Sequence, residues 1–155
     1  GGSLSDYTAW LLERSMKTLT VRFYEQQKNA KILSSFLNDS SSIEKVHFPG
    51  IENNEFYAIA CKQMDGFGAV ISFELIKNIN PKEFLTSLEL INPSMSFAGV
   101  ESTMLSPAET SHQLLSEKQR IEQGIVDNLI RFSVGIEDPE DLIDDINLSI
   151  YKCKK

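Results

Sequence analysis

The most informative segment of the sequence comprises residues 129–143, LIRFSVGIEDPEDLI. Its first part, Leu129 to Val134, is mostly apolar and predicts a strand. Asp138 followed by Pro139 is typical of a helix start, because an aspartate caps free amides and proline fits the first turn. The segment therefore predicts a strand and then a final helix. The expected inner face of that helix comprises Leu142, Ile143, Ile146 and Ile150.

Upstream of this segment, the hydrophobic pattern alternates between helical and extended periods. Residues 5–37 favour two helices with a bend near residues 15–21. The apolar face expected for the second helix, Thr20 to Leu37, comprises Phe23, Ala30, Leu33, Phe36 and Leu37. Strands are expected at residues 43–48, 69–75 and 96–104, and short helices at residues 55–63, 82–90 and 117–122. This order predicts an α/β sandwich with helices packed on a small sheet.

Length, charge and cysteine content narrow the class of protein. A chain of 155 residues allows one domain, and its net charge of -7 argues against a nucleic-acid binder, which needs a basic face. No apolar run is long enough to cross a bilayer. Cys61 and Cys153 form no metal-type pair, so two free thiols in a reducing compartment are expected. These features indicate a cytoplasmic protein.

Catalytic signals are sparse when the residues are considered alone. His47 and His112 lie far apart and lack metal-ligand spacing. The glycines at positions 66 and 68 lack the third glycine of a nucleotide-binding loop, and a turn is expected there. The acidic residues Glu137, Asp138, Glu140, Asp141, Asp144 and Asp145 surround the start of the last helix. We expect them to interact with the helix dipole and to remain solvated.

Arg131 is unusual because it interrupts the apolar strand at residues 129–134. An unpaired guanidinium is costly to bury. Its side chain could point outward or pair with a carboxylate such as Glu101. It could instead point into a cleft and bind a ligand carboxylate through two parallel hydrogen bonds. The pattern alone favours the first interpretation, because strand edges often contain single charges.

Several motifs, in the expected order, resemble the transsulfuration family of pyridoxal-phosphate enzymes, which includes cystathionine synthases and lyases and homoserine-ester sulfhydrylases. Residues 129–143 are similar to the family's L-[IV]-R-[LF]-S-[VI]-G-[IL]-E-D-x-E-D-L-[IL], and residues 9–19, AWLLERSMKTL, to A-W-L-x-x-R-G-L-K-T-L. Residues 96–102, SFAGVES, resemble S-L-G-G-V-E-S. The remaining matches are NA at 29–30, FPG at 48–50, QMDGFG at 63–68, SF at 72–73 and TSH at 110–112.

The resemblance implies the C-terminal domain of a fold-type I pyridoxal-phosphate enzyme, with a small, mainly antiparallel sheet and helices packed on it. Residues 1–19 would end the large domain and form a linker helix, and residues 20–155 would form the small domain. By the same resemblance, Arg131 binds the substrate α-carboxylate, and Ser96 helps to position the catalytic lysine. These implications reverse the interpretation of Arg131 from pattern alone.

Two departures from the family pattern limit the assignment. Met95 occupies a substrate-binding position where γ-acting members often have glutamate, so β-elimination or sulfhydrylation remains open. The family's cofactor-binding lysine lies in an upstream S-x-T-K segment that this sequence lacks. Lys17 matches the structural A-W-L motif instead, and an ordinary exposed lysine is protonated and non-nucleophilic. We therefore expect no residue here to bind the cofactor covalently, and no activity from this chain alone.

Two hypotheses follow for the function. In the first, the chain binds the amino-acid substrate within a longer pyridoxal-phosphate enzyme, whose substrate is cystathionine, homocysteine, cysteine or a homoserine ester. The resemblance also implies a homo-oligomer, a tetramer in the full enzyme. In the second, the chain is a non-catalytic α/β module for binding or oligomerisation.

Overall fold

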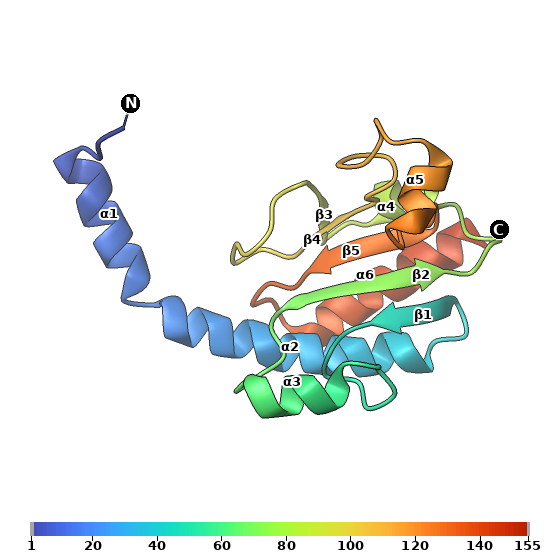
Figure 1. The fold of residues 1–155 in the computed structure, drawn as a ribbon, viewed down its shortest axis with the longest axis horizontal. Coiled ribbons are helices and arrows are strands. Elements are labelled where there is room, and N and C mark those ends of the chain that lie inside the picture. Colours follow the sequence, from blue (N-terminus) through green and yellow to red (C-terminus); the bar gives the residue numbers. More distant parts are fainter. Residues whose placement is uncertain (1, 155) are drawn as a thin grey trace.

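A computed structural model describes residues 2–154, within which six helices and one five-stranded sheet form (Figure 1). The helices are α1 (Asp6–Met16), α2 (Leu19–Asp39), α3 (Tyr57–Gln63), α4 (Pro81–Ser87), α5 (Glu117–Glu122) and α6 (Pro139–Cys153). The strands are β1 (Ile43–His47), β2 (Val70–Leu75), β3 (Asn92–Pro93), β4 (Thr103–Leu105) and β5 (Leu129–Ser133).

The sheet is mainly antiparallel, as predicted, with strand order β1-β2-β5-β4-β3. β5 lies at its centre and pairs antiparallel with β2 on one side and β4 on the other. Only the short pair β3 and β4 is parallel. The strand predicted from residues 129–134 is thus the central strand of the sheet, with a neighbouring strand on both sides.

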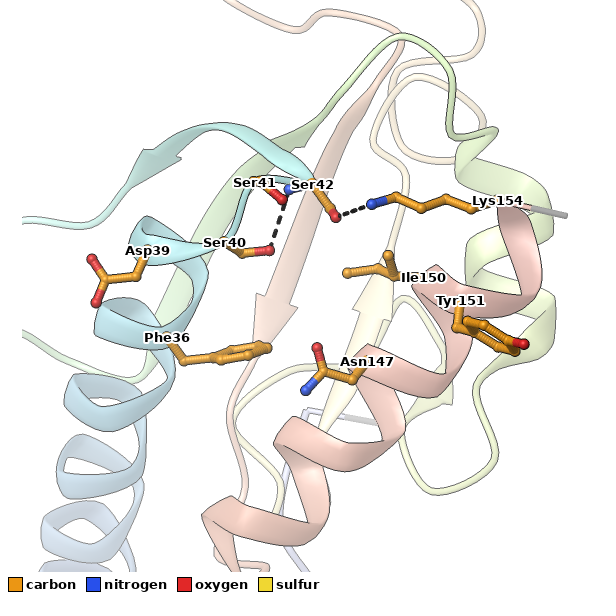
Figure 2. Close-up of a pocket in the computed structure, with 9 residues that line it drawn as sticks. All are labelled: Phe36, Asp39, Ser40, Ser41, Ser42, Asn147, Ile150, Tyr151 and Lys154. Atoms are coloured by element: carbon orange, nitrogen blue, oxygen red, sulfur yellow. Dashed lines mark hydrogen bonds between the residues drawn. The ribbon is translucent and has the colours of Figure 1, made fainter.

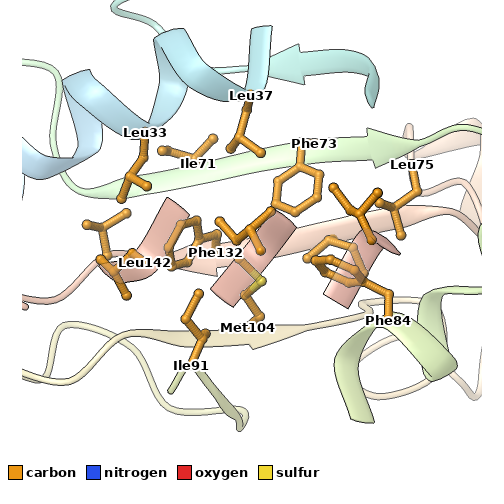
Figure 3. Packing of buried hydrophobic residues seen from close by; sticks show 14 of the residues in the cluster. Leu33, Leu37, Ile71, Phe73, Leu75, Phe84, Ile91, Met104, Phe132 and Leu142 are labelled. Atoms are coloured by element: carbon orange, nitrogen blue, oxygen red, sulfur yellow. The ribbon is translucent and has the colours of Figure 1, made fainter. Parts of the chain in front are cut away.

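The hydrophobic core lies between the sheet and helices α2 and α6, which contact each other behind it (Figure 1). Side chains alternate along a strand, so Ile130 and Phe132 of β5 both face this core and are fully buried. Figure 3 shows the cluster built from side chains of every layer; its labelled members are Leu33, Leu37, Ile71, Phe73, Leu75, Phe84, Ile91, Met104, Phe132 and Leu142.

Local capping fixes several helix boundaries where the sequence predicts them. The Asp138 side chain accepts a hydrogen bond from the amide of Glu140 at 2.9 Å, which begins α6. Asn80 caps α4 in the same way, and Gly124 follows α5 with φ 75°. α4 ends at Ser87, earlier than expected, because the amides of the residues that follow it bind elsewhere in the fold.

The first helices extend away from the sheet. α1 has no buried residue, and Figure 1 shows it projecting beyond the body of the fold. The predicted bend lies between α1 and α2. The expectation that Phe23 faces the core is wrong: it is 46% exposed, because the first turns of α2 also lie beyond the sheet. The first buried residue of α2 is Gln26, a polar one.

The extended segment expected at residues 96–104 is mostly a loop. Only Thr103–Leu105 joins the sheet as β4, and Asn92–Pro93 forms β3 beside it. Ala98 has φ 64°, the only positive φ of a non-glycine residue in the described chain, and this conformation interrupts an extended strand. The residues between Ser94 and Ser102 therefore form a loop, and two of its carbonyls accept hydrogen bonds from a side chain of β5.

Candidate functional site

Arg131 lies in the middle of β5, on the sheet face opposite the core. Its strand neighbours Ile130 and Phe132 point to the core, so the alternation places Arg131 and Ser133 together on the other face. This arrangement resolves the conflict in the sequence: a guanidinium can occupy an apolar central strand because only alternate residues enter the core. Arg131 itself is half-buried.

The guanidinium of Arg131 is held by backbone oxygens of the 94–102 loop. Its Nη2 donates to the carbonyls of Met95 and Ser96, each at 3.0 Å. Its Cζ lies 5.3 Å from the ring centroid of Phe97, within cation–π range. The loop therefore contacts Arg131 through three consecutive residues.

Arg131 retains an unsatisfied donor. Its Nε is buried and has no hydrogen-bond partner among residues 2–154. The pairing with Glu101 considered from the sequence is absent, since Arg131 makes no salt bridge within the described chain. Burial lowers the pKa of Arg131, but a guanidinium remains charged at neutral pH. A half-desolvated cation with an orphaned donor suits a carboxylate, which accepts two parallel hydrogen bonds.

Both other residues singled out by the sequence lie beside this guanidinium. The structure brings Met95 and Ser96 to Arg131 through their backbone carbonyls, while both residues remain exposed. The Ser96 carbonyl also accepts a hydrogen bond from the hydroxyl of Thr103, at 2.8 Å. Thr103 is buried on β4, so it anchors the loop to the sheet. No pattern in the sequence indicates this role for Thr103.

A second network fixes the far end of the loop. The Glu137 carboxylate accepts hydrogen bonds from the Ser102 amide at 2.6 Å and the Ser102 hydroxyl at 2.9 Å. The Gly135 amide donates to the same hydroxyl at 2.9 Å, and the Asn29 side chain donates to the Glu137 carbonyl at 2.7 Å. The expectation that Glu137 is solvated at the helix start is therefore wrong: it links the loop to the end of β5.

Asp145 also departs from the expected solvated role. It is 7% exposed, and its carboxylate accepts three hydrogen bonds of 2.8–3.0 Å from the amides of Glu89, Leu90 and Ile91. These bonds end α4 early and direct the chain into β3, just before Met95. The sequence could not show which of these acidic residues are buried and which are solvated, because the amides that Asp145 binds lie far away in the chain.

Several surface hollows lie elsewhere on the molecule. Figure 2 shows one of about 540 Å³, where the end of α2 faces α6 and Lys154 donates to the hydroxyl of Ser42 at 2.8 Å. None of the residues predicted for the site lines it. His47 contacts Glu74 at 2.7 Å and His112 contacts the Ser111 hydroxyl at 2.8 Å. Neither pair has the several converging ligands of a metal site. Across residues 2–154 no cluster of three or more potential metal ligands occurs.

The sequence, fold and site together define the class of protein. The chain belongs to the family of Cys/Met metabolism PLP-dependent enzymes, which matches residues 1–151. It is 39% identical over 152 residues to a cystathionine beta-lyase of Lactococcus lactis subsp. cremoris (strain MG1363), covering 98% of this chain and 40% of that protein. It is 38% identical over 150 residues to a cystathionine gamma-lyase of Bacillus subtilis (strain 168), with coverage of 97% and 40%.

Solved structures of relatives share this fold. The chain is similar to a cystathionine gamma-lyase from Lactobacillus plantarum complexed with L-serine, with a TM-score of 0.92, 36% identity, and coverage of 97% and 40%. It is also similar to a cystathionine gamma synthase from Xanthomonas oryzae pv. oryzae in complex with cystathionine, with a TM-score of 0.89, 33% identity, and coverage of 97% and 39%. The predicted family and fold class are confirmed, and the chain spans about 40% of these relatives.

The residues of this chain suit the substrate of a pyridoxal-phosphate enzyme. The orphaned Nε of Arg131 fits the carboxylate of an amino acid. Lys17, the lysine considered from the sequence pattern, is an exposed residue that directly follows α1 and pairs with Glu13 of that helix at 3.1 Å. Separately, no described helix is both long and apolar enough to span a bilayer.

Proposed function

We propose that the chain is the substrate-carboxylate-binding, C-terminal domain of a pyridoxal-phosphate-dependent transsulfuration enzyme. The observation that supports this most strongly is the Arg131 guanidinium, which is fixed by two carbonyls yet retains a buried donor without a partner. Buried donors are almost always paired in native proteins. An amino-acid α-carboxylate would satisfy this donor and the charge together.

In this proposal the chain has two parts. Residues 1–19 form the end of the large domain and a linker helix, and residues 20–155 form the small domain. The support is that α1 has no buried residue and projects from the sheet, whereas the chain from Gln26 onward enters the core. Exposed apolar side chains on α1, such as Trp10 and Leu12, are costly in isolation and suit burial against another part of an enzyme.

Each site residue has a distinct role. Arg131 holds the substrate α-carboxylate and thereby fixes the orientation of the amino acid, which in the best intramolecular cases is worth about 7–11 kcal/mol. Pyridoxal phosphate, when bound, supplies the electron sink for the reaction. Ser96 helps to position the catalytic lysine contributed from outside this sequence. Met95, 64% exposed beside Arg131, contacts the substrate side chain.

The substrate class is an α-amino acid of sulfur metabolism: cystathionine, homocysteine, cysteine or a homoserine ester. Two relatives bind amino acids: the cystathionine gamma-lyase from Lactobacillus plantarum is complexed with L-serine, and the cystathionine gamma synthase from Xanthomonas oryzae pv. oryzae with cystathionine. We further propose that the enzyme is cytoplasmic and homo-oligomeric, as a tetramer. Its site requires the large domain, so we propose that this chain alone is inactive.

The Arg131 assignment is tested by substitution in the full-length enzyme. Arg131→Ala should lower kcat/KM for L-cystathionine by about a hundredfold or more, since truncating one partner of a hydrogen-bonded charge pair costs about 2–5 kcal/mol. Arg131→Lys should rescue little, because an ammonium lacks the planar fork. Steady-state kinetics with unchanged cofactor absorbance measure both effects. Near-normal kinetics of Arg131→Ala would remove this residue from the site.

A further inference from the structure

Phe97 is a large apolar residue in an unusual position. It is 64% exposed, and its ring lies against the Arg131 guanidinium with 5.3 Å between Cζ and the ring centroid. Scattered exposed apolar side chains are normal on protein surfaces. What requires an explanation here is the contact, because the ring covers a side chain that has a buried, unpartnered donor.

Arg131 and Ser133, on the face of β5 opposite the core, hold the loop on both sides of Phe97. Arg131 Nη2 binds the carbonyls of Met95 and Ser96, which precede the ring. The Ser133 hydroxyl accepts a hydrogen bond at 3.1 Å from the amide of Ala98, which follows it. Arg131 and Ser133 are two residues apart and share one sheet face. The loop residues on both sides of Phe97 are therefore bound to the same strand, β5, and this fixes the position of Phe97.

The backbone next to the ring is held in a costly conformation. Ala98 has φ 64°, a left-handed region that favours glycine and that a non-glycine residue adopts only when its surroundings enforce it. The enforcing contacts are the Ser133 bond and the bond from the Gln26 side chain to the Gly99 carbonyl, at 2.6 Å. Strain of this kind is concentrated at ligand sites, where it fixes a geometry in advance.

We propose that Phe97 is a positioning residue that orders the Arg131 guanidinium for the substrate carboxylate. The Arg131 Cζ lies over the ring, and this contact keeps water from that side of the cation and restricts rotation of the Arg131 side chain. The Nε donor on the edge of the plane still lacks a partner among residues 2–154 and can serve a carboxylate. The inference rests on the proposed function, since it assigns the second group of the same carboxylate site.

The test compares Phe97→Leu, which removes the ring but keeps an apolar side chain, with Phe97→Tyr, which keeps the ring. In the full-length holoenzyme with L-cystathionine, Phe97→Leu should raise KM about threefold to tenfold, the range expected for a partly desolvated cation–π contact. The kcat should change less than about twofold, as expected when ground-state binding is lost. Phe97→Tyr should remain within about twofold of the parent KM.

Inhibition by L-serine and L-serinamide separates carboxylate binding from a general structural effect. Phe97→Leu should weaken inhibition by L-serine by the same factor as KM and leave L-serinamide unchanged, because the amide lacks the charge. In an Arg131→Ala background Phe97→Leu should add no further loss. Equal weakening of both inhibitors, or a parent-like KM for Phe97→Leu, overturns the inference.

The same series distinguishes this inference from the proposed function. If Arg131→Ala is impaired while Phe97→Leu behaves as the parent, the carboxylate site stands and only the role of Phe97 is wrong. If Arg131→Ala itself has near-normal kinetics, the proposed function is wrong, and with it the role of the ring.

Discussion

At the scale of single residues, Arg131 has few contacts in the candidate site. Two carbonyls and one ring contact the guanidinium, and one buried donor remains unpaired within residues 2–154. The two carbonyls belong to a loop with almost no regular structure. Its geometry is therefore set by side chains that reach it from β4, β5 and α2, and those residues should be as sensitive to substitution as Arg131.

Gly135, just after β5, is a further position where a substitution should disturb the loop. A Cβ atom there would overlap the Val100 carbonyl oxygen and the Glu137 carboxylate, so the junction of β5 and the loop would have to open. Gly135→Ala should destabilise the chain by about 1–3 kcal/mol, as overpacking typically does. Urea unfolding measures this change, with Gly2→Ala as the control, since a Cβ there would meet open space and the backbone has no positive φ. A Gly135→Ala chain as stable as the control would contradict the packing described.

At the scale of elements, the sequence predicted what is determined locally. Asp138 and Asn80 cap their helices through amides two or three residues away, and the β5 pattern lies within six residues. The 94–102 loop was mispredicted as extended because its partners, Arg131 and Ser133, lie about 35 residues further along the chain. Hydrophobic period and capping contain no information on such contacts. The residue roles in the loop came from the family resemblance.

The turn between α4 and β3 depends on one carboxylate from α6. Asp145→Ala would remove the acceptor of the amides of residues 89–91, of which that of Ile91 is buried, and a buried unsatisfied group costs about 1–3 kcal/mol. The free energy of unfolding should therefore fall by at least about 2 kcal/mol in urea titrations. Asp144→Ala, at the neighbouring position outside this network, should change stability by less than about 0.5 kcal/mol. Equal effects of the two substitutions would contradict the role of Asp145.

At the scale of the whole molecule, the chain is a folded unit whose first helix, α1, exposes apolar side chains. The core between the sheet and helices α2 and α6 is continuous, while α1 buries nothing. The chain also spans only about 40% of its relatives. These observations suit a domain that receives the substrate carboxylate and depends on another domain for the cofactor.

This dependence gives a direct expectation for the isolated chain. Mixed with pyridoxal phosphate and L-cystathionine, it should release neither pyruvate nor 2-oxobutyrate above the rate of free cofactor. It should also form no fast, specific aldimine at Lys17, which is exposed and paired with Glu13. Absorbance titration and product analysis measure both. A saturable aldimine that is lost in Lys17→Ala but kept in Lys62→Ala would contradict the proposal.

The proposed function depends on the Arg131 guanidinium binding the α-carboxylate of an amino acid. A crystal structure of the full-length holoenzyme with L-serine measures this most directly. We expect the ligand carboxylate within about 2.7–3.0 Å of the guanidinium nitrogens, including Nε, with the Met95 and Ser96 carbonyls still bound to Nη2. A carboxylate bound by other residues, with Arg131 Nε still lacking a partner, would contradict it.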